Sequence, residues 1–253
     1  MPRTLIVGGC PRSGTTALMR LLNCHPGVSL GDERYYWRFE RGELSPGLFE
    51  PDRFFDLREA DRHWAEGRDP LPGVTRAAYE AAAWRGDKYP PLWRAFEAIE
   101  ERLPGARILC VVRNPLSVAE SYAARAADED DAWPFGASRA IADWNRAVRA
   151  GFRAVEAGRD VAVVAFESVF APGADLAPLF AALGLDAGPA LGACEDVTAK
   201  AARLFRRDKP TDEGLRREVC LGADFAAYER LSAHCLYRRA APNPACSPRV
   251  RAA

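Results

Sequence analysis

The sequence predicts an α/β fold, a three-layer sandwich in which helices cover both faces of a central parallel sheet. Three apolar runs, Leu5–Val7, Ile108–Val112 and Val161–Phe166, are the candidate strands. Helix-patterned segments separate them, and this alternation is typical of βαβ units and a parallel sheet. With 253 residues, 48% of them hydrophobic, the chain can form a conventional core. We expect a single domain over residues 1–239 and a flexible tail over residues 240–253, which holds three prolines.

The first strand leads into a glycine-containing turn, Gly9-Cys10-Pro11-Arg12-Ser13-Gly14-Thr15-Thr16. A helix is expected over Thr15–Asn23, because Leu18, Leu21 and Leu22 then fall on one face. Backbone N–H groups at a helix N-terminus have no intrahelical acceptor, and with the positive end of the macrodipole they attract anions. The turn therefore predicts a phosphorylated ligand.

The turn differs from the loop of nucleotide triphosphatases in the position of its cation. The pattern G-x-x-x-x-G-K-[ST] has a lysine after the second glycine, where this chain has Thr15. The cation is instead Arg12, inside the turn, and its guanidinium can donate two hydrogen bonds to one phosphate or sulfate-bearing group. A loop without that lysine is poorly suited to ATP cleavage. It suits a donor with a single 5′-phosphate.

A second candidate phosphate element follows the strand Ile108–Val112. Arg113 would lie at the carboxyl end of this strand, and Asn114-Pro115 turns the chain into a helix from Leu116 onward. Ser121, about two turns into that helix, can present its hydroxyl to the same edge, which is where open α/β sheets bind ligands. Two such elements fit a bisphosphorylated nucleotide.

These two motifs resemble those of the sulfotransferases that use 3′-phosphoadenosine 5′-phosphosulfate (PAPS), in the P-R-S-G-T-T branch of tyrosylprotein and many bacterial enzymes. The resemblance covers about residues 4–185. It implies a P-loop NTPase-like sulfotransferase fold, PAPS as donor and 3′-phosphoadenosine 5′-phosphate (PAP) as product. In the family, the strand-terminal arginine and the serine, here Arg113 and Ser121, hold the 3′-phosphate. The implied donor-binding residues of the turn are Arg12, Ser13, Gly14, Thr15 and Thr16.

Sulfuryl transfer to a hydroxyl needs a group that accepts the hydroxyl proton. The His25-Pro26-Gly27 sequence ends the first helix, and Val28–Gly31 returns as a short extended piece before Asp32 and Glu33. In the tyrosylprotein-like branch a glutamate at this distance from the loop is the general base, and the resemblance gives this role to Glu33. Its neighbour Asp32 is the alternative carboxylate.

A further motif, Gly86-Asp87-Lys88-Tyr89-Pro90-Pro91, matches the G-x-K-x-P element of the same branch. The cytosolic branch has a histidine base two residues after its lysine, and here that position is Pro90. By resemblance, Lys88 stabilises the charge that builds on the bridging oxygen as the 5′-phosphate leaves. Arg12, Lys88 and the loop amides then take the part that magnesium plays in kinases, so no metal is expected.

Other segments have secondary roles in this interpretation. Glu167-Ser168-Val169 resembles the family's Y-E-D-L element and is expected to support the phosphate loop. Helices are expected over Ala137–Ala157 and over Leu176–Leu183, the latter closed by Gly184. In cytosolic members of the family, an arginine-lysine-glycine loop near the C-terminus reaches the 3′-phosphate, and no clear copy of it is evident here. Basic residues of the C-terminal region either substitute for that loop or form a solvated basic face: Arg203, Arg206, Arg207 and Lys209.

The sequence gives less information about the acceptor than about the donor. Residues 34–85 are rich in aromatic side chains, which are candidates for an apolar or phenolic acceptor pocket: Tyr35, Tyr36, Trp37, Phe39, Phe54, Phe55, Trp64, Tyr79 and Trp84. His25 is expected to be structural, and His63 is the one histidine that can face an acceptor. We expect a hydroxyl of a small molecule or a peptide, and the sequence does not distinguish a monomer from a homodimer.

Composition excludes several other classes. Acidic and basic residues number 35 each, which argues against a nucleic-acid or acidic-membrane partner. No stretch approaches the roughly 20 apolar residues of a membrane span, and no signal peptide is evident. The seven cysteines form no C-x-x-C pair or zinc-ligand cluster. We therefore expect a cytoplasmic, bacterial-style enzyme without a metal.

Two alternatives from other classes are a P-loop kinase of small metabolites and a noncatalytic nucleotide-binding protein of the same fold. A kinase should contain the Walker lysine, and Thr15 argues against it. A noncatalytic protein would bind the nucleotide without turnover.

Overall fold

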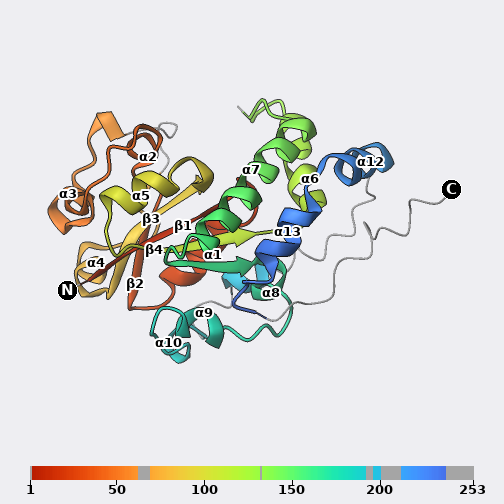
Figure 1. Cartoon of the computed structure of the whole chain (residues 1–253). Helices are drawn as coiled ribbons and strands as arrows, with labels where there is room; N and C mark the ends of the chain where they lie inside the picture. Colours follow the sequence, from red (N-terminus) through yellow and green to blue (C-terminus); the bar gives the residue numbers. More distant parts are fainter. Residues whose placement is uncertain (1, 62–68, 132, 192–195, 201–211, 238–253) are drawn as a thin grey trace.

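The computed structural model describes residues 2–61, 69–131, 133–191, 196–200 and 212–237. Five strands form one parallel sheet in the order β2-β3-β1-β4-β5. Their bounds are β1 Arg3–Gly9, β2 Val28–Asp32, β3 Trp84–Pro91, β4 Arg107–Val112 and β5 Val161–Ala165. Figure 1 shows helices on both sides of this sheet, so the expected α/β sandwich is confirmed.

The α-helices of the described residues are α1 Thr15–Asn23, α2 Tyr36–Arg41, α3 Pro51–Phe55, α4 Arg76–Ala81, α5 Phe96–Arg102, α6 Pro115–Ala126, α7 Ala137–Glu156, α8 Phe166–Val169, α9 Ala177–Ala181, α10 Gly188–Leu191, α12 Glu213–Gly222 and α13 Phe225–Ser232. Short 3₁₀ helices are η1 Pro46–Phe49, η2 Glu59–Asp61 and η3 Leu92–Arg94. None of these helices is long and apolar enough to cross a membrane.

Side-chain alternation along the strands divides the core into two faces. On β4, Leu109 and Val111 belong to the cluster that packs against α1, α8 and α9. Their neighbours Ile108 and Cys110 belong to the cluster on the opposite face, with α5 and α7. Successive residues of a strand point to opposite faces, and a parallel sheet covered on both faces has buried residues throughout. The apolar runs of the sequence therefore mark the central layer.

The expected helices Thr15–Asn23 and Ala137–Ala157 are present, the second ending one residue earlier. Phe166 was expected to end the third strand but begins α8. The sequence-based interpretation missed β3, because it assigned the G-x-K-x-P motif no secondary structure. This strand is central, pairing with both β1 and β2. Its prolines, Pro90 and Pro91, lie at the carboxyl end, where the register with β1 shifts, so they remove few ladder hydrogen bonds.

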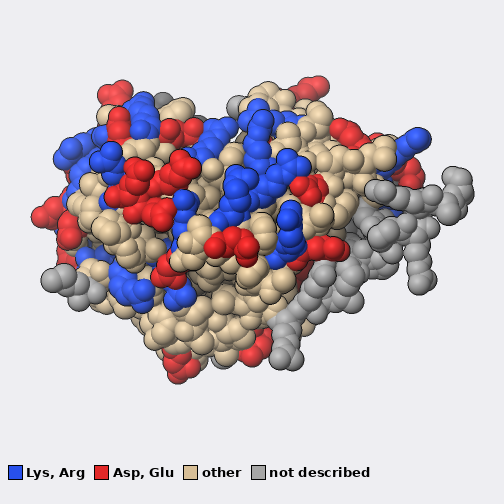
Figure 2. Space-filling view, viewed as in Figure 1, with Lys and Arg blue, Asp and Glu red and all other residues tan. Residues whose placement is uncertain are grey.

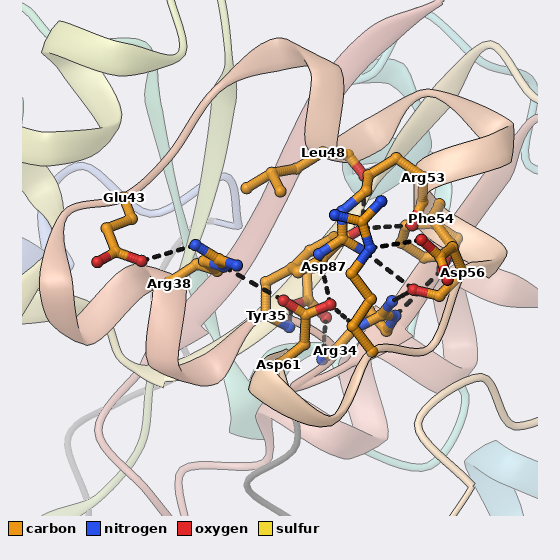
Figure 3. Close-up of polar contacts among 11 residues, drawn as sticks. Arg34, Tyr35, Arg38, Glu43, Leu48, Arg53, Phe54, Asp56, Asp61 and Asp87 are labelled. Carbon is orange, nitrogen blue, oxygen red and sulfur yellow. Dashed lines mark hydrogen bonds and ion pairs between the residues drawn. The ribbon is translucent and has the colours of Figure 1, made fainter.

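A buried ion-pair network joins α2 to the segment over residues 46–61 (Figure 3). The Asp61 carboxylate is fully buried and pairs with Arg34 at 3.1 Å, with Arg38 at 3.2 Å and with Arg53 at 2.5 Å. Burial raises the pKa of Asp61, but hydrogen bonds from Arg53 and Arg34 outweigh that effect and hold the pKa below its usual value. The carboxylate therefore stabilises this part of the fold as an anion.

Asp61→Asn is expected to lower the free energy of unfolding by about 3–5 kcal/mol at pH 7, because it leaves buried guanidinium groups without an anion. The melting temperature should fall by roughly 6–20 °C. A depressed folded pKa means that the stabilisation is present above the unfolded pKa, about 4, and is lost as the pH falls through the folded value. The difference between the variant and the unmodified protein should therefore shrink in acid.

Thermal unfolding at several pH values measures this difference. Asp52→Asn is the control, because Asp52 pairs with Arg76 but its side chain is fully exposed, and such pairs contribute little. Equal small effects of the two variants would contradict the role given to Asp61.

Candidate functional site

The carboxyl ends of four adjacent parallel strands meet at one edge of the sheet. In sheet order, β2 ends at Asp32, β3 carries Lys88 near its end, β1 leads into the turn over residues 10–14, and β4 is followed by Arg113. Asp32 and Lys88 are partners in the register of β2 and β3, and Val7 is the partner of Lys88 on β1. The candidate residues of four separate motifs are thus brought to one edge, as predicted for an open α/β sheet.

The turn after β1 has the backbone geometry of an anion cradle. Arg12 has φ 69° and Gly14 has φ 94°, both in the left-handed region, with Ser13 between them. Gly14 is the N-cap of α1, without a side-chain cap hydrogen bond, and the first turn of α1 holds no acidic residue. Among the described residues, the buried Ser13 hydroxyl has no hydrogen-bond partner apart from the Cys10 thiol. The turn therefore presents donors to a ligand.

Gly14 is required by close packing as well as by its positive φ. A Cβ atom at this position would lie 2.3 Å from Cδ2 of Phe166, at the start of α8. The guanidinium of Arg113 also contacts Phe166, because it lies over the ring at 4.3 Å from the ring centre. The next residue, Glu167, accepts a hydrogen bond from the backbone N–H of Asn114 at 2.8 Å. The segment that begins at Phe166 and includes the Glu167-Ser168-Val169 motif thus packs against the turn after β1 and the residue after Arg113.

Arg12, Arg113 and Ser121 are also brought together. Arg12 donates a hydrogen bond from Nε to the Ser121 hydroxyl at 2.9 Å, and Arg113 donates to the carbonyl of Arg12 at 3.1 Å. Burial, with the nearby charges of Arg125 and Arg113, lowers the pKa of Arg12, and burial lowers the pKa of Arg113. Arginine stays charged even so. The shift of Arg12 marks like charges nearby, whose repulsion an anion would relieve.

Lys88 lies between the two candidate carboxylates. Its ammonium is 2.6 Å from Asp32 Oδ1 and also contacts Glu33 Oε1. The side chain of Lys88 is 1% exposed, that of Asp32 6% and that of Glu33 13%. Because Glu33 is the more accessible carboxylate, it is the better placed of the two to meet a substrate.

Asp87 is a feature that the sequence-based interpretation quoted in a motif but gave no role. It is fully buried in β3, and burial raises its pKa to about 7, although hydrogen bonds from the N–H groups of Tyr35 and Arg34 act in the opposite direction. An acidic residue next to a lysine is an ordinary surface pattern. Only the strand assignment for residues 84–91 shows that the two side chains point to opposite faces of the sheet.

For most of the aromatic candidates of residues 34–85, the structure supports a core position and not an acceptor pocket. Most of these rings are core residues with 0–2% exposure: Tyr35, Phe39, Phe54, Tyr79 and Trp84. Phe54 and Tyr79 stack on each other, with ring centres 4.1 Å apart. Trp37 is 39% exposed, and it contacts Tyr36 edge to face beside the Glu33 turn. Trp64 lies outside the described residues.

His25 has the structural role that was expected. It is buried, accepts a hydrogen bond from the N–H of Gly27 and contacts the carbonyl of Asp186, each at 2.9 Å. His63, the basic residues of 203–209 and the tail 240–253 lie outside the described residues. Within the described part of the chain, no cluster of three histidine, cysteine or acidic residues could hold a metal ion.

Charge on the molecular surface is mixed. Figure 2 shows basic side chains gathered near the middle of the face where Figure 1 draws α7. Arginines of that helix are paired with carboxylates: Arg139 and Arg146 contact Asp143, and Arg149 contacts Asp224. This pairing offsets much of the positive charge of the helix.

A family profile described as "Sulfotransferase family" matches residues 3–187. The chain belongs to the sulfotransferase family. It is thus a transferase of the sulfotransferase class, with the P-loop-like fold of that family. Comparison with curated protein sequences finds no match.

Several solved sulfotransferase structures have a similar fold. The sulfotransferase domain of the Synechococcus PCC 7002 olefin synthase has 22% identity and a TM-score of 0.53, covering 94% of this chain and 96% of its own. The sulfotransferase domain of the curacin biosynthetic pathway has 16% identity and a TM-score of 0.54, covering 95% and 99%. The sulfotransferase of Alicyclobacillus acidocaldarius has 20% identity and a TM-score of 0.51, covering 92% and 95%. At these identities the similarity shows the fold alone.

Gly14→Ala is expected to weaken binding of PAP by about tenfold or more, because the new methyl group would push on Phe166 and strain the positive φ. Calorimetric titration with PAP measures the effect. The control is Gly136→Ala, where an added Cβ meets no atom within 4 Å. If both variants bind PAP like the unmodified protein, the turn does not depend on Gly14.

Proposed function

We propose that this sulfotransferase moves the sulfuryl group of PAPS to a hydroxyl of a small-molecule or peptide acceptor. The observation that supports it best is the arrangement along the sheet edge. An anion cradle and two guanidinium groups lie at β1 and β4, and a carboxylate pair with a buried ammonium lies at β2 and β3. The first part suits a nucleotide with two phosphates, and the second suits proton transfer.

The residues of the cradle fit the donor. The open N–H groups at the start of α1, the Ser13 hydroxyl and Arg12 are proposed to bind the 5′-phosphosulfate end, with Gly14, Thr15 and Thr16. Arg113 and Ser121 are proposed to bind the 3′-phosphate, and both already contact Arg12. The donor supplies the sulfuryl group and leaves as PAP.

The proton is proposed to pass from the acceptor hydroxyl to Glu33. As the hydroxyl oxygen forms its bond to sulfur, the bond from sulfur to the 5′-phosphate oxygen breaks, and the proton goes to the Glu33 carboxylate. Lys88 and Arg12 then supply positive charge for the oxygen that leaves. Asp32 is more buried than Glu33 and shares Lys88 with it, which supports a role in holding the ammonium.

Sulfuryl transfer places less negative charge on the transferring group than phosphoryl transfer does, so fixed cations are proposed to replace a metal ion here. The proposed location is the cytoplasm, because Cys10 and Cys110 are buried thiols of the core that take no part in a disulfide. The acceptor and the oligomeric state are not assigned.

The donor can be tested without knowing the acceptor. Calorimetric titrations in chelator should show much tighter binding of PAP than of adenosine 5′-phosphate. Arg113→Ala should weaken PAP binding by about 10- to 100-fold, because charged hydrogen bonds to the 3′-phosphate are lost, and should affect adenosine 5′-phosphate far less. Equal losses for the two nucleotides would reject the role of Arg113, and binding only of ATP with magnesium would favour the kinase alternative.

Glu33→Gln should lower turnover by about 10²–10⁴-fold while PAP binding is retained, because the amide cannot accept the proton. Labelled PAPS and a panel of phenols, alcohols and tyrosine peptides, with water as the background acceptor, measure turnover. Asp32→Asn in the same assay tests the alternative base. Unchanged turnover of Glu33→Gln would overturn the assignment, and a complete absence of turnover in the unmodified protein across the panel and water would favour the noncatalytic alternative.

A further inference from the structure

The backbone at Glu33 is in an uncommon conformation. Its φ is 61°, in the left-handed region, where residues with a side chain are rarely found. On one side, the N–H of Glu33 donates to the Lys88 carbonyl at 3.0 Å, and on the other, the N–H of Tyr36 donates to the Glu33 carbonyl at 3.3 Å. Such a conformation persists only where the surroundings hold it.

Asp87 supplies further restraints on this turn. Its carboxylate accepts hydrogen bonds from the N–H of Arg34 at 3.0 Å, from the N–H of Tyr35 at 2.8 Å and from the N–H of Lys88 at 2.9 Å (Figure 3 labels Arg34, Tyr35 and Asp87). The two residues that follow Glu33 are therefore tied to β3 through one fully buried side chain. When the Asp87 carboxylate is ionised, it makes these hydrogen bonds stronger than a neutral acceptor does.

The sequence leaves space for this contact at Gly31, the register partner of Asp87 on β2. A Cβ atom on Gly31 would lie 2.9 Å from Asp87 Oδ1 and 2.8 Å from the Cβ of Arg34. The Asp87 carboxylate therefore reaches the turn across a backbone position that has no side chain.

The other end of the turn is fixed through the Arg34 side chain. Its buried guanidinium donates to the Phe54 carbonyl at 3.1 Å and to Asp61 at 3.1 Å. The backbone of Arg34 is thus held by Asp87 while its side chain is held by the segment over residues 46–61. Little freedom is left for the preceding residue to rotate.

Resting on the proposed function, we infer that Asp87 is a positioning residue for the general base. Adjacent residues of β3 act on opposite faces of the sheet: Lys88 contacts the carboxylate of Glu33, and Asp87 holds the backbone that follows it. Asp87 does not touch the substrate in this interpretation. It determines where the Glu33 carboxylate stands relative to the phosphate loop.

The decisive variant is Asp87→Asn, which keeps the shape of the side chain but turns one acceptor oxygen into a donor. One N–H of the turn then meets an N–H₂ group, so the Glu33 backbone should loosen. We expect turnover to fall by about 10- to 100-fold, as displacement of a catalytic group does, with PAP binding unchanged. Turnover is measured with the best acceptor of the panel, or as release of labelled sulfate to water.

A double-mutant cycle separates positioning from general damage to the fold. If Asp87 acts through Glu33, then Asp87→Asn should cause no further loss of turnover in a Glu33→Gln background. An equal loss in both backgrounds, or no loss in either, would overturn the inference. Asp224→Asn is the matched control, because the Asp224 carboxylate also accepts a backbone N–H, from Ala227 at 3.0 Å, and lies on the N-cap of α13. This variant should leave turnover unchanged.

A measurement on the unmodified protein covers the case in which Asp87→Asn does not fold. Amide hydrogen exchange followed by NMR should show that the N–H groups of Arg34 and Tyr35 are strongly protected. Rapid exchange of both would contradict the clamp. This readout does not depend on catalysis. If Glu33→Gln leaves turnover unchanged, the proposed base is rejected, and hydrogen exchange still shows whether Asp87 holds the turn.

Discussion

The carboxyl edge of this sheet depends on the burial of the Lys88 ammonium between Asp32 and Glu33. A buried cation is costly without anions, so the ends of β2 and β3 must stay in register for the fold to be stable. β1 pairs with β3 on its other side, and the phosphate loop follows β1 directly. The contact that pairs the charges therefore also sets the distance between the carboxylates and the anion cradle. Such fixed geometry is what electrostatic catalysis requires.

The partners of Asp87 and Lys88 explain why a strand that contains charged residues can be buried. Asp87 and Lys88 point to opposite faces, and each finds partners that satisfy it: backbone N–H groups for the first and carboxylates for the second. The partners of both residues come largely from outside β3. Asp32 lies at the end of β2, and the N–H groups of Arg34 and Tyr35 lie in the turn after it. The turn after β2 is consequently the place where two layers of polar contacts converge, one on each face of the sheet.

Much of this architecture could be predicted from the sequence, for physical reasons. Apolar runs identify β1, β4 and β5, and the glycine-containing turn before a helix identifies the cradle, because both signals are local. β3 was missed because Asp87, Lys88 and two prolines contradict the apolar pattern of a central strand, and their partners are distant in sequence. For the aromatic residues of 34–85, a pocket and the core both stayed open, because composition cannot distinguish a core ring from an exposed one. Only packing shows that Tyr35 and Phe54 are core residues.

The strand order also separates charge along the edge. Asp32, Glu33 and Lys88 together carry one net negative charge on the β2 and β3 side, whereas Arg12 and Arg113 lie on the β1 and β4 side, where burial and like charges lower the pKa of Arg12. This separation of charge favours binding of a polyanionic ligand on the second side. A neutral hydroxyl has no charge repulsion to overcome near Glu33. In the proposed function, the nucleotide would therefore lie on the β1 and β4 side, and its sulfuryl group would meet the acceptor hydroxyl near Lys88 and Glu33.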